Sequence, residues 1–163
     1  MCGIVVIFGE NVGRQATNLK DMLSKLAHRG PDDEGIHIAD KVAMGQKRLS
    51  IIDVAGGKQP IFSEDKQKII VCNGEIYNHH SLRSQLSQHQ FSTHTDTEVI
   101  VHLLEEEGEK AISRLDGMFA FVFYNGNDIL VARDPLGIKP LYQGEKDGFL
   151  FFASEMKSLE GMV

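Results

Sequence analysis

Three short, largely apolar segments constrain the fold of this chain most strongly. They are residues 3–8, 68–73 and 118–124. β-Branched and aromatic side chains dominate the first and third, which is typical of strands, and the Ile-Ile-Val-Cys centre of the second is apolar enough for burial on both faces. We therefore expect a protein built around covered β-sheets.

Three further segments predict helices. Leucine and methionine recur at helical spacing over residues 19–26, and Gly30-Pro31 is expected to end this helix just after His28 and Arg29. A short helix is expected over residues 81–88. Residues 95–98, Thr-Asp-Thr-Glu, match a capping box and predict a helix that starts at Thr95.

The remaining strands are expected in pairs. Two short strands fit between residues 36 and 52, with a turn at Asp40-Lys41. Asn125-Gly126-Asn127 predicts the turn of one hairpin, and residues 146–148 predict the turn of another between Leu141 and Ala153. Many antiparallel strands with a few amphipathic helices indicate an α+β protein in which helices cover sheets.

Composition limits the class of protein further. A chain of 163 residues fits one domain, and its apolar runs fall far short of the roughly 20 residues that span a bilayer. A net charge of −6 argues against nucleic acid as a partner, because phosphate binding needs a basic surface. No signal peptide is recognisable, and two cysteines without paired spacing favour a reducing compartment. We expect a soluble, cytoplasmic domain with no membrane partner.

Cys2 is a candidate nucleophile because it directly follows the initiator Met1. Cysteine is small enough that we expect Met1 to be removed, which would leave a thiol and a free α-amine on one residue. The thiol titrates near about 8.5 and the amine near about 7.7–8.0, so the amine can serve as general base for the thiol. Taken alone, an N-terminal cysteine usually has no such role. Cys72, within a strand pattern, is expected to be a small buried residue.

Seven short motifs occur in an ordered series along almost the whole chain. They are MCGI at 1–4, HRGPD at 28–32, RLSIID at 48–53, NGEIYN at 73–78, DGMFA at 116–120, RDPLGIKPLY at 133–142 and ASEMK at 153–157. The series resembles the glutaminase domain of glutamine-hydrolysing asparagine synthetase, a class II glutamine amidotransferase of the N-terminal-nucleophile hydrolase type. The resemblance implies one domain over residues 1–163. It also implies a four-layer αββα sandwich, two antiparallel sheets between helices.

The resemblance also implies residue roles. Cys2 would attack the side-chain amide of glutamine and form a thioester, while Asn73 and Gly74 would form the oxyanion hole. The substrate carboxylate would be held by Arg48, whose rigid fork suits a bidentate contact. The substrate ammonium would be held by Glu75 and Asp96. The remaining substrate-binding residues implied are Leu49, Ser50, Ile51 and Ile52.

Each of these residues also has a structural interpretation. Arg48 could be a surface charge on a strand, Asn73-Gly74 an ordinary turn, and Asp96 a carboxylate favoured by a helix N-terminus. The seven histidines show no linear metal motif, so no metal site is expected. The glycines do not follow phosphate-loop spacing, so no nucleotide site is expected either.

The function expected is hydrolysis of glutamine to glutamate and ammonia, without a cofactor. The family's second domain, which uses ATP and magnesium to activate aspartate and receives the ammonia, has no counterpart in these 163 residues. We therefore expect an excised or truncated domain, or a subunit with a separate synthetase partner. Two alternatives stay open: a glutaminase module for another ATP-dependent amidation, and a catalytically silent module that binds glutamine or docks onto a synthetase.

Overall fold

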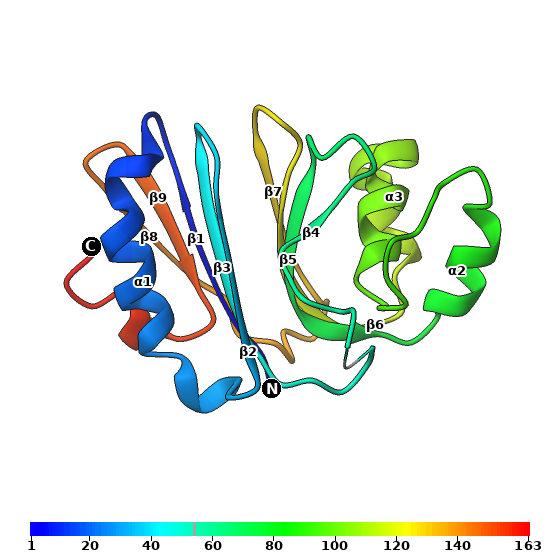
Figure 1. Cartoon of the computed structure of the whole chain (residues 1–163), viewed down its shortest axis with the longest axis horizontal. Coiled ribbons are helices and arrows are strands. Elements are labelled where there is room, and N and C mark those ends of the chain that lie inside the picture. Colours follow the sequence, from blue (N-terminus) through cyan, green and yellow to red (C-terminus); the bar gives the residue numbers. More distant parts are fainter. Residues whose placement is uncertain (54) are drawn as a thin grey trace.

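The computed structural model describes residues 1–53 and 55–163. Two antiparallel sheets face each other, and helices lie on their outer sides (Figure 1). The first sheet has the spatial order β2 (Asp33–Ile38), β3 (Val42–Arg48), β1 (Gly3–Phe8), β9 (Phe149–Ala153) and β8 (Tyr142–Lys146). The second has the order β4 (Ile61–Phe62), β5 (Ile69–Ile76), β6 (Gly117–Tyr124) and β7 (Ile129–Arg133).

Three α-helices complete the layers. Helix α1 (Ala16–Ser24) covers the first sheet, and α2 (His79–Gln85) and α3 (Glu98–Glu107) lie outside the second (Figure 1). Short 3-10 helices occupy Val12–Gln15, Ala27–Arg29, Gly108–Arg114 and Met156–Ser158. The predicted α+β class and the four-layer sandwich are confirmed. Among the described residues, no helix is long and apolar enough to cross a membrane.

The central strands are largely apolar because both of their faces are buried. In β1, Val5 and Ile7 pack in the cluster under α1, whereas Ile4 and Val6 pack in the cluster between the two sheets. In β5 and β6 the same alternation divides side chains between the inter-sheet cluster and the cluster under α3. Successive side chains of a strand point to opposite faces, so a strand between two cores has no solvent side.

The first predicted helix is shorter than expected. Helix α1 ends at Ser24, and the chain continues to Arg29 through a 3-10 helix instead of an α-helical last turn. The backbone N–H of Leu26 donates to the carbonyl of Leu23, a tighter turn that begins before Gly30-Pro31. Leu26 is fully buried in the cluster under α1. The turn therefore tightens where this side chain enters the core.

The predicted capping box at residues 95–98 is wrong. Helix α3 begins at Glu98, and the Thr95 hydroxyl pairs with the hydroxyl of Thr93. The Glu98 carboxylate accepts the backbone N–H groups of Ser92 and Thr93 instead of reaching back to Thr95. Glu98, the first residue of the helix, thus holds the loop that precedes it, and Thr95 and Asp96 line a pocket.

The predicted strand pairs and hairpins are confirmed, with small shifts at their ends. The pair formed by β2 and β3 ends at Arg48, so residues 49–52 lie in a loop. The short strand β4 was not anticipated, because two residues leave no periodic pattern. It pairs with β5 only at Ile69 and Ile70, which leaves the rest of that edge of β5 without a strand neighbour.

Candidate active site

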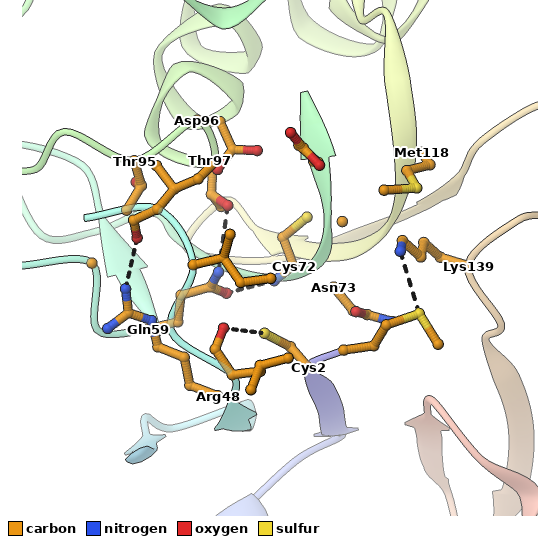
Figure 2. A pocket seen from close by; sticks show the side chains of 17 residues that line it. Cys2, Arg48, Gln59, Cys72, Asn73, Thr95, Asp96, Thr97, Met118 and Lys139 are labelled. Atoms are coloured by element: carbon orange, nitrogen blue, oxygen red, sulfur yellow. Dashed lines mark hydrogen bonds between the residues drawn. The ribbon is translucent and has the colours of Figure 1, made fainter. Parts of the chain in front are cut away.

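A pocket of roughly 160 Å³ opens where the ends of the two sheets meet. Cys2 enters it from the start of β1, Arg48 from the end of β3 and Asn73 from β5 (Figure 2). Every site residue expected from the sequence lines this pocket except Ser50. The backbone N–H of Ser50 donates to the Asp32 carboxylate, 2.8 Å away, so Ser50 braces the loop from outside the pocket.

The position of Cys2 is fixed through its backbone. Its carbonyl oxygen accepts a 2.9 Å hydrogen bond from Nε of Arg29, and Arg29 forms a 2.9 Å ion pair with Glu155. Partial burial opposes ionisation of Glu155, but the contacts with Arg29 and His28 lower its pKa to about 2. Two of the sequence motifs, at 28–32 and 153–157, therefore meet behind Cys2. The Sγ atom itself lies 3.7 Å from the carbonyl oxygen of Leu49 (Figure 2).

The backbone N–H of Gly74 points away from the neighbouring strand β6 and toward the pocket. Gly74 lies opposite Phe119 in β6, and both backbone groups of Phe119 bond to Asp134 on the other side. In an antiparallel pair of strands, residue pairs with and without hydrogen bonds alternate. Tyr77 donates to Asp116, which lies directly opposite, so Gly74, three positions away, belongs to a pair without hydrogen bonds. The Gly74 N–H therefore faces the open edge of β5.

Side chains occupy that open edge on both sides of Gly74. The Gln59 amide oxygen accepts the N–H of Cys72 at 2.7 Å, and the Asp96 carboxylate accepts the N–H of Ile76 at 2.7 Å. For Gly74 no such acceptor is present among the described residues. A Cβ at this position would lie 2.4 Å from the carbonyl oxygen of Met118, so only glycine fits at this position of the strand. The result is one directed backbone donor facing the pocket.

Asn73 supplies a second donor without a partner. Its side chain is 1% exposed, and its Nδ2 atom is buried with no hydrogen-bond partner among the described residues. Ile69 and Val71, at the same alternation in β5, face the first sheet, so Asn73 faces the side on which Cys2 lies. A buried N–H group without an acceptor costs free energy unless a ligand satisfies it. The pocket thus holds two adjacent donors and a thiol.

Charged groups flank these donors. Arg48 is buried, and its Nη2 atom donates to the carbonyl oxygens of Ile52 at 2.9 Å and Asp53 at 2.7 Å, so this cation holds the 49–53 loop. Burial raises the pKa of Asp96, although the N–H of Ile76 opposes the rise. Glu75 also lines the pocket. The pocket lining therefore carries a cation and two carboxyl groups beside the two donors.

Sequence reasoning missed several lining residues, of which Lys139 and Gln59 matter most. Lys139 is 5% exposed, and its Nζ lies 3.5 Å from Sδ of Met1, which also lines the pocket (Figure 2). Asp134 holds the loop before it by accepting the N–H groups of residues 138 and 139. The RDPLGIKPLY motif was the available signal for Lys139. No sequence signal marked Gln59, because its role depends on the open edge of β5.

Cys72 lines the pocket but is a poor nucleophile. It is 2% exposed, and burial raises the pKa of its thiol, with the negative charges of Asp96 and Cys2 adding to the rise. The prediction that Cys72 is a small buried residue is confirmed. Of the two free cysteines, Cys2 is the one with a thiol in a partly exposed position.

The sequence matches the family model described as a glutamine amidotransferase domain over residues 1–163. The chain belongs to the glutamine amidotransferase family. It is 47% identical over 164 aligned residues to glutamine-hydrolyzing asparagine synthetase 2 of Arabidopsis thaliana, covering 98% of this chain and 28% of that protein. It is 43% identical to the probable glutamine-hydrolyzing asparagine synthetase of Dictyostelium discoideum, covering 98% of this chain and 30% of that protein.

Solved structures show the same fold. Glutamine phosphoribosylpyrophosphate amidotransferase from B. subtilis, complexed with ADP and GMP, superposes with a TM-score of 0.81 at 24% identity, covering 98% of this chain and 43% of that one. This glutamine amidotransferase domain thus shares its fold, two antiparallel sheets between helices, with that solved structure. The chain spans less than a third of the length of the two asparagine synthetases above.

Proposed function

We propose that this glutamine amidotransferase domain hydrolyses the side-chain amide of glutamine to glutamate and ammonia, with Cys2 as nucleophile. The observation that carries the proposal is a pair of donors in the pocket that Cys2 enters: Nδ2 of Asn73, which has no partner among the described residues, and the N–H of Gly74, which faces the open edge of β5. A tetrahedral intermediate of acyl transfer places negative charge on one oxygen, which such a donor pair stabilises.

The reaction begins with proton transfer from the Cys2 thiol to its own α-amine. This step requires removal of Met1, which lines the pocket in the chain that carries it. The sulfur attacks the amide carbon, and the oxyanion accepts hydrogen bonds from Asn73 and Gly74. The amine returns the proton to the leaving nitrogen, ammonia departs, and a glutamyl thioester remains. Water, deprotonated by the same amine, attacks the thioester and forms a second oxyanion. This oxyanion collapses by breaking the C–S bond, which releases glutamate, and the departing Cys2 sulfur recovers the proton from the amine.

The charges around the donors match the other end of glutamine. Arg48 suits the α-carboxylate, since its guanidinium already lies at the pocket wall and is held by the 49–53 loop. Glu75 and Asp96 suit the α-ammonium. The raised pKa of Asp96 falls when a cation binds next to it, which couples substrate binding to ionisation.

We further propose that the ammonia serves an ATP-dependent synthetase domain or subunit of the asparagine synthetase type. This proposal is supported by the sequence identity to two asparagine synthetases. This chain aligns with less than a third of the length of each. We propose that glutamine hydrolysis itself needs no cofactor, because thiol, amine and donors account for each step. A cytoplasmic location fits the two free cysteines.

Glutamate release by the chain tests the proposal directly. Intact mass first establishes that Met1 is removed, and acid-quenched protein is then examined for a glutamyl adduct after mixing with glutamine. We expect turnover and the adduct in the parent, and neither in Cys2→Ala, which loses little packing at the chain terminus. Turnover in Cys2→Ala within about tenfold of the parent contradicts covalent catalysis by this residue. If the parent protein has lost Met1 but forms neither the adduct nor glutamate, the proposal as a whole is contradicted.

A further inference from the structure

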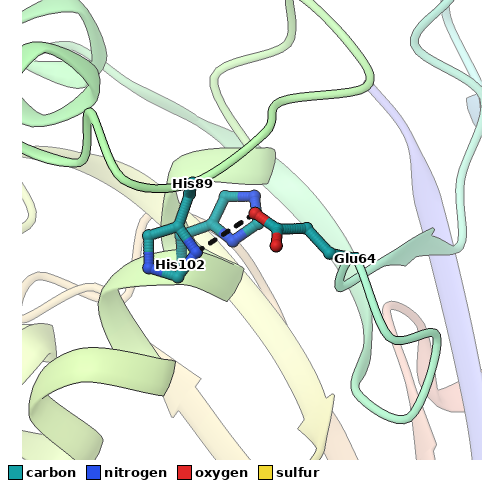
Figure 3. Close-up of side chains that lie close together, drawn as sticks. All are labelled: Glu64, His89 and His102. Atoms are coloured by element: carbon teal, nitrogen blue, oxygen red, sulfur yellow. Dashed lines mark ion pairs between the residues drawn. The ribbon is translucent and has the colours of Figure 1, made fainter.

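A second cluster of polar side chains lies outside the pocket, under α3 on the outer side of the second sheet. Glu64 comes from the turn after β4, His89 from the segment after α2 and His102 from α3. One ligand atom from each lies within 4.8 Å of the others, and none of the three residues lines the pocket. Figure 3 shows the two imidazole rings next to each other with the Glu64 carboxylate beside them.

The Nδ1 atoms of both histidines face carboxylates. Nδ1 of His89 is 3.4 Å from Oε1 of Glu64 and 3.8 Å from Oε2 of Glu105. Nδ1 of His102 is 2.9 Å from that same Glu105 oxygen. The rings are stacked, with centroids 4.4 Å apart and an interplanar angle of 27°. Two nitrogens and two carboxylates therefore converge on one place.

The opposite nitrogens face carboxylates of their own. Nε2 of His89 is 3.1 Å from Glu106. Nε2 of His102 is buried without a hydrogen-bond partner among the described residues, and Oε1 of Glu98 lies 3.9 Å away. Histidines that ligate metals present one nitrogen to the ion and direct the other to a carboxylate or carbonyl, which fixes the ring and its tautomer. The His89 ring shows that arrangement, whereas Nε2 of His102 faces Glu98 without a hydrogen bond.

We propose that Glu64, His89 and His102 bind one divalent transition metal ion, with Glu105 as a fourth ligand. Imidazole and carboxylate together suit Zn²⁺, which takes four such ligands in structural sites. The ion joins three segments that are far apart in sequence, which is why no linear motif marks the site. Glu98, in the outer shell, also holds the backbone N–H groups of Ser92 and Thr93. The site therefore braces the loop that leads to the pocket residues Thr95–Thr97.

Calorimetric titration of the untagged, metal-free chain with Zn²⁺ tests this proposal. The protein carries Cys2→Ala, because the N-terminal thiol would otherwise bind zinc. We expect one ion per chain with a Kd of about 10 μM or tighter at pH 7.5. Glu64→Gln and His89→Asn change partly exposed side chains and should each weaken binding at least tenfold.

His80→Asn, at an exposed histidine of α2, is the matched control and should bind zinc as the parent does. A melting curve with saturating zinc gives a second readout: the midpoint should rise in the parent and control, and stay constant in the two ligand variants. Binding that Glu64→Gln and His89→Asn leave unchanged, or the absence of stoichiometric binding in a folded parent, overturns the proposal.

Discussion

Replacing Asn73 with alanine tests the oxyanion hole more sharply than any other substitution. Nδ2 of Asn73 is buried and has no partner among the described residues, so its removal breaks no hydrogen bond of the resting protein. Its stability should therefore change little, with a melting midpoint within about 3 °C of the parent. The Gly74 N–H remains, so part of the oxyanion stabilisation should survive.

The loss should appear in the chemical step. Removing one oxyanion donor costs about 10²–10³ in kcat, which corresponds to about 2.7–4 kcal/mol. The change in KM should be much smaller, because the contact strengthens as charge develops on the oxygen. The assay is steady-state glutamate release by protein freed of Met1, measured beside a thermal melt of the same preparation.

Asn78 provides the matched control. Its Nδ2 donates to the carbonyl of Arg114 at 2.9 Å, and its Oδ1 accepts the N–H of Asp116 at 3.1 Å. Asn78→Ala should therefore cost about 1–3 kcal/mol of stability and leave kcat per folded molecule unchanged. If Asn73→Ala instead behaves like Asn78→Ala, losing stability while keeping a normal kcat, Asn73 is structural and the reasoning is refuted.

Two further substitutions address a cation of the pocket and a carboxylate that holds the loop leading to it. Arg48→Lys should lower kcat/KM by about 5–150-fold (1–3 kcal/mol), chiefly through KM, because lysine keeps the charge but loses the two-pronged contact; unchanged steady-state kinetics would remove Arg48 from substrate binding. The pKa of Glu98 is about 2 in the folded protein against an ordinary 4.5, so its carboxylate stabilises the fold above about pH 4.5 and ceases to do so as the pH falls toward 2. Glu98→Gln should therefore lower the urea midpoint strongly at pH 7 and little at pH 2.5, and an equal loss at both pH values would contradict the assignment.

Local pattern was sufficient to predict most of the secondary structure. The apolar runs identified β1, β5 and β6, and the Asn125-Gly126-Asn127 turn identified the hairpin that follows, because these signals arise from neighbouring residues. The family resemblance also implied a set of site residues of which all but Ser50 line one pocket. Each motif lies at a strand end or in a loop, where a side chain can reach the pocket without disturbing a core.

Other features depend on segments that meet only in three dimensions. The direction of the Gly74 N–H follows from the hydrogen-bond alternation between β5 and β6 and from the early end of β4, neither of which the sequence around Gly74 contains. The capping prediction at Thr95 failed for the same reason, since the Glu98 carboxylate is taken by Ser92 and Thr93. His89 and His102 meet Glu64 through packing of α3 on the second sheet. Sequence determined which residues are apolar, reactive or charged, whereas the tertiary structure decided which of their polar groups are left without a partner, because that depends on every neighbour in space.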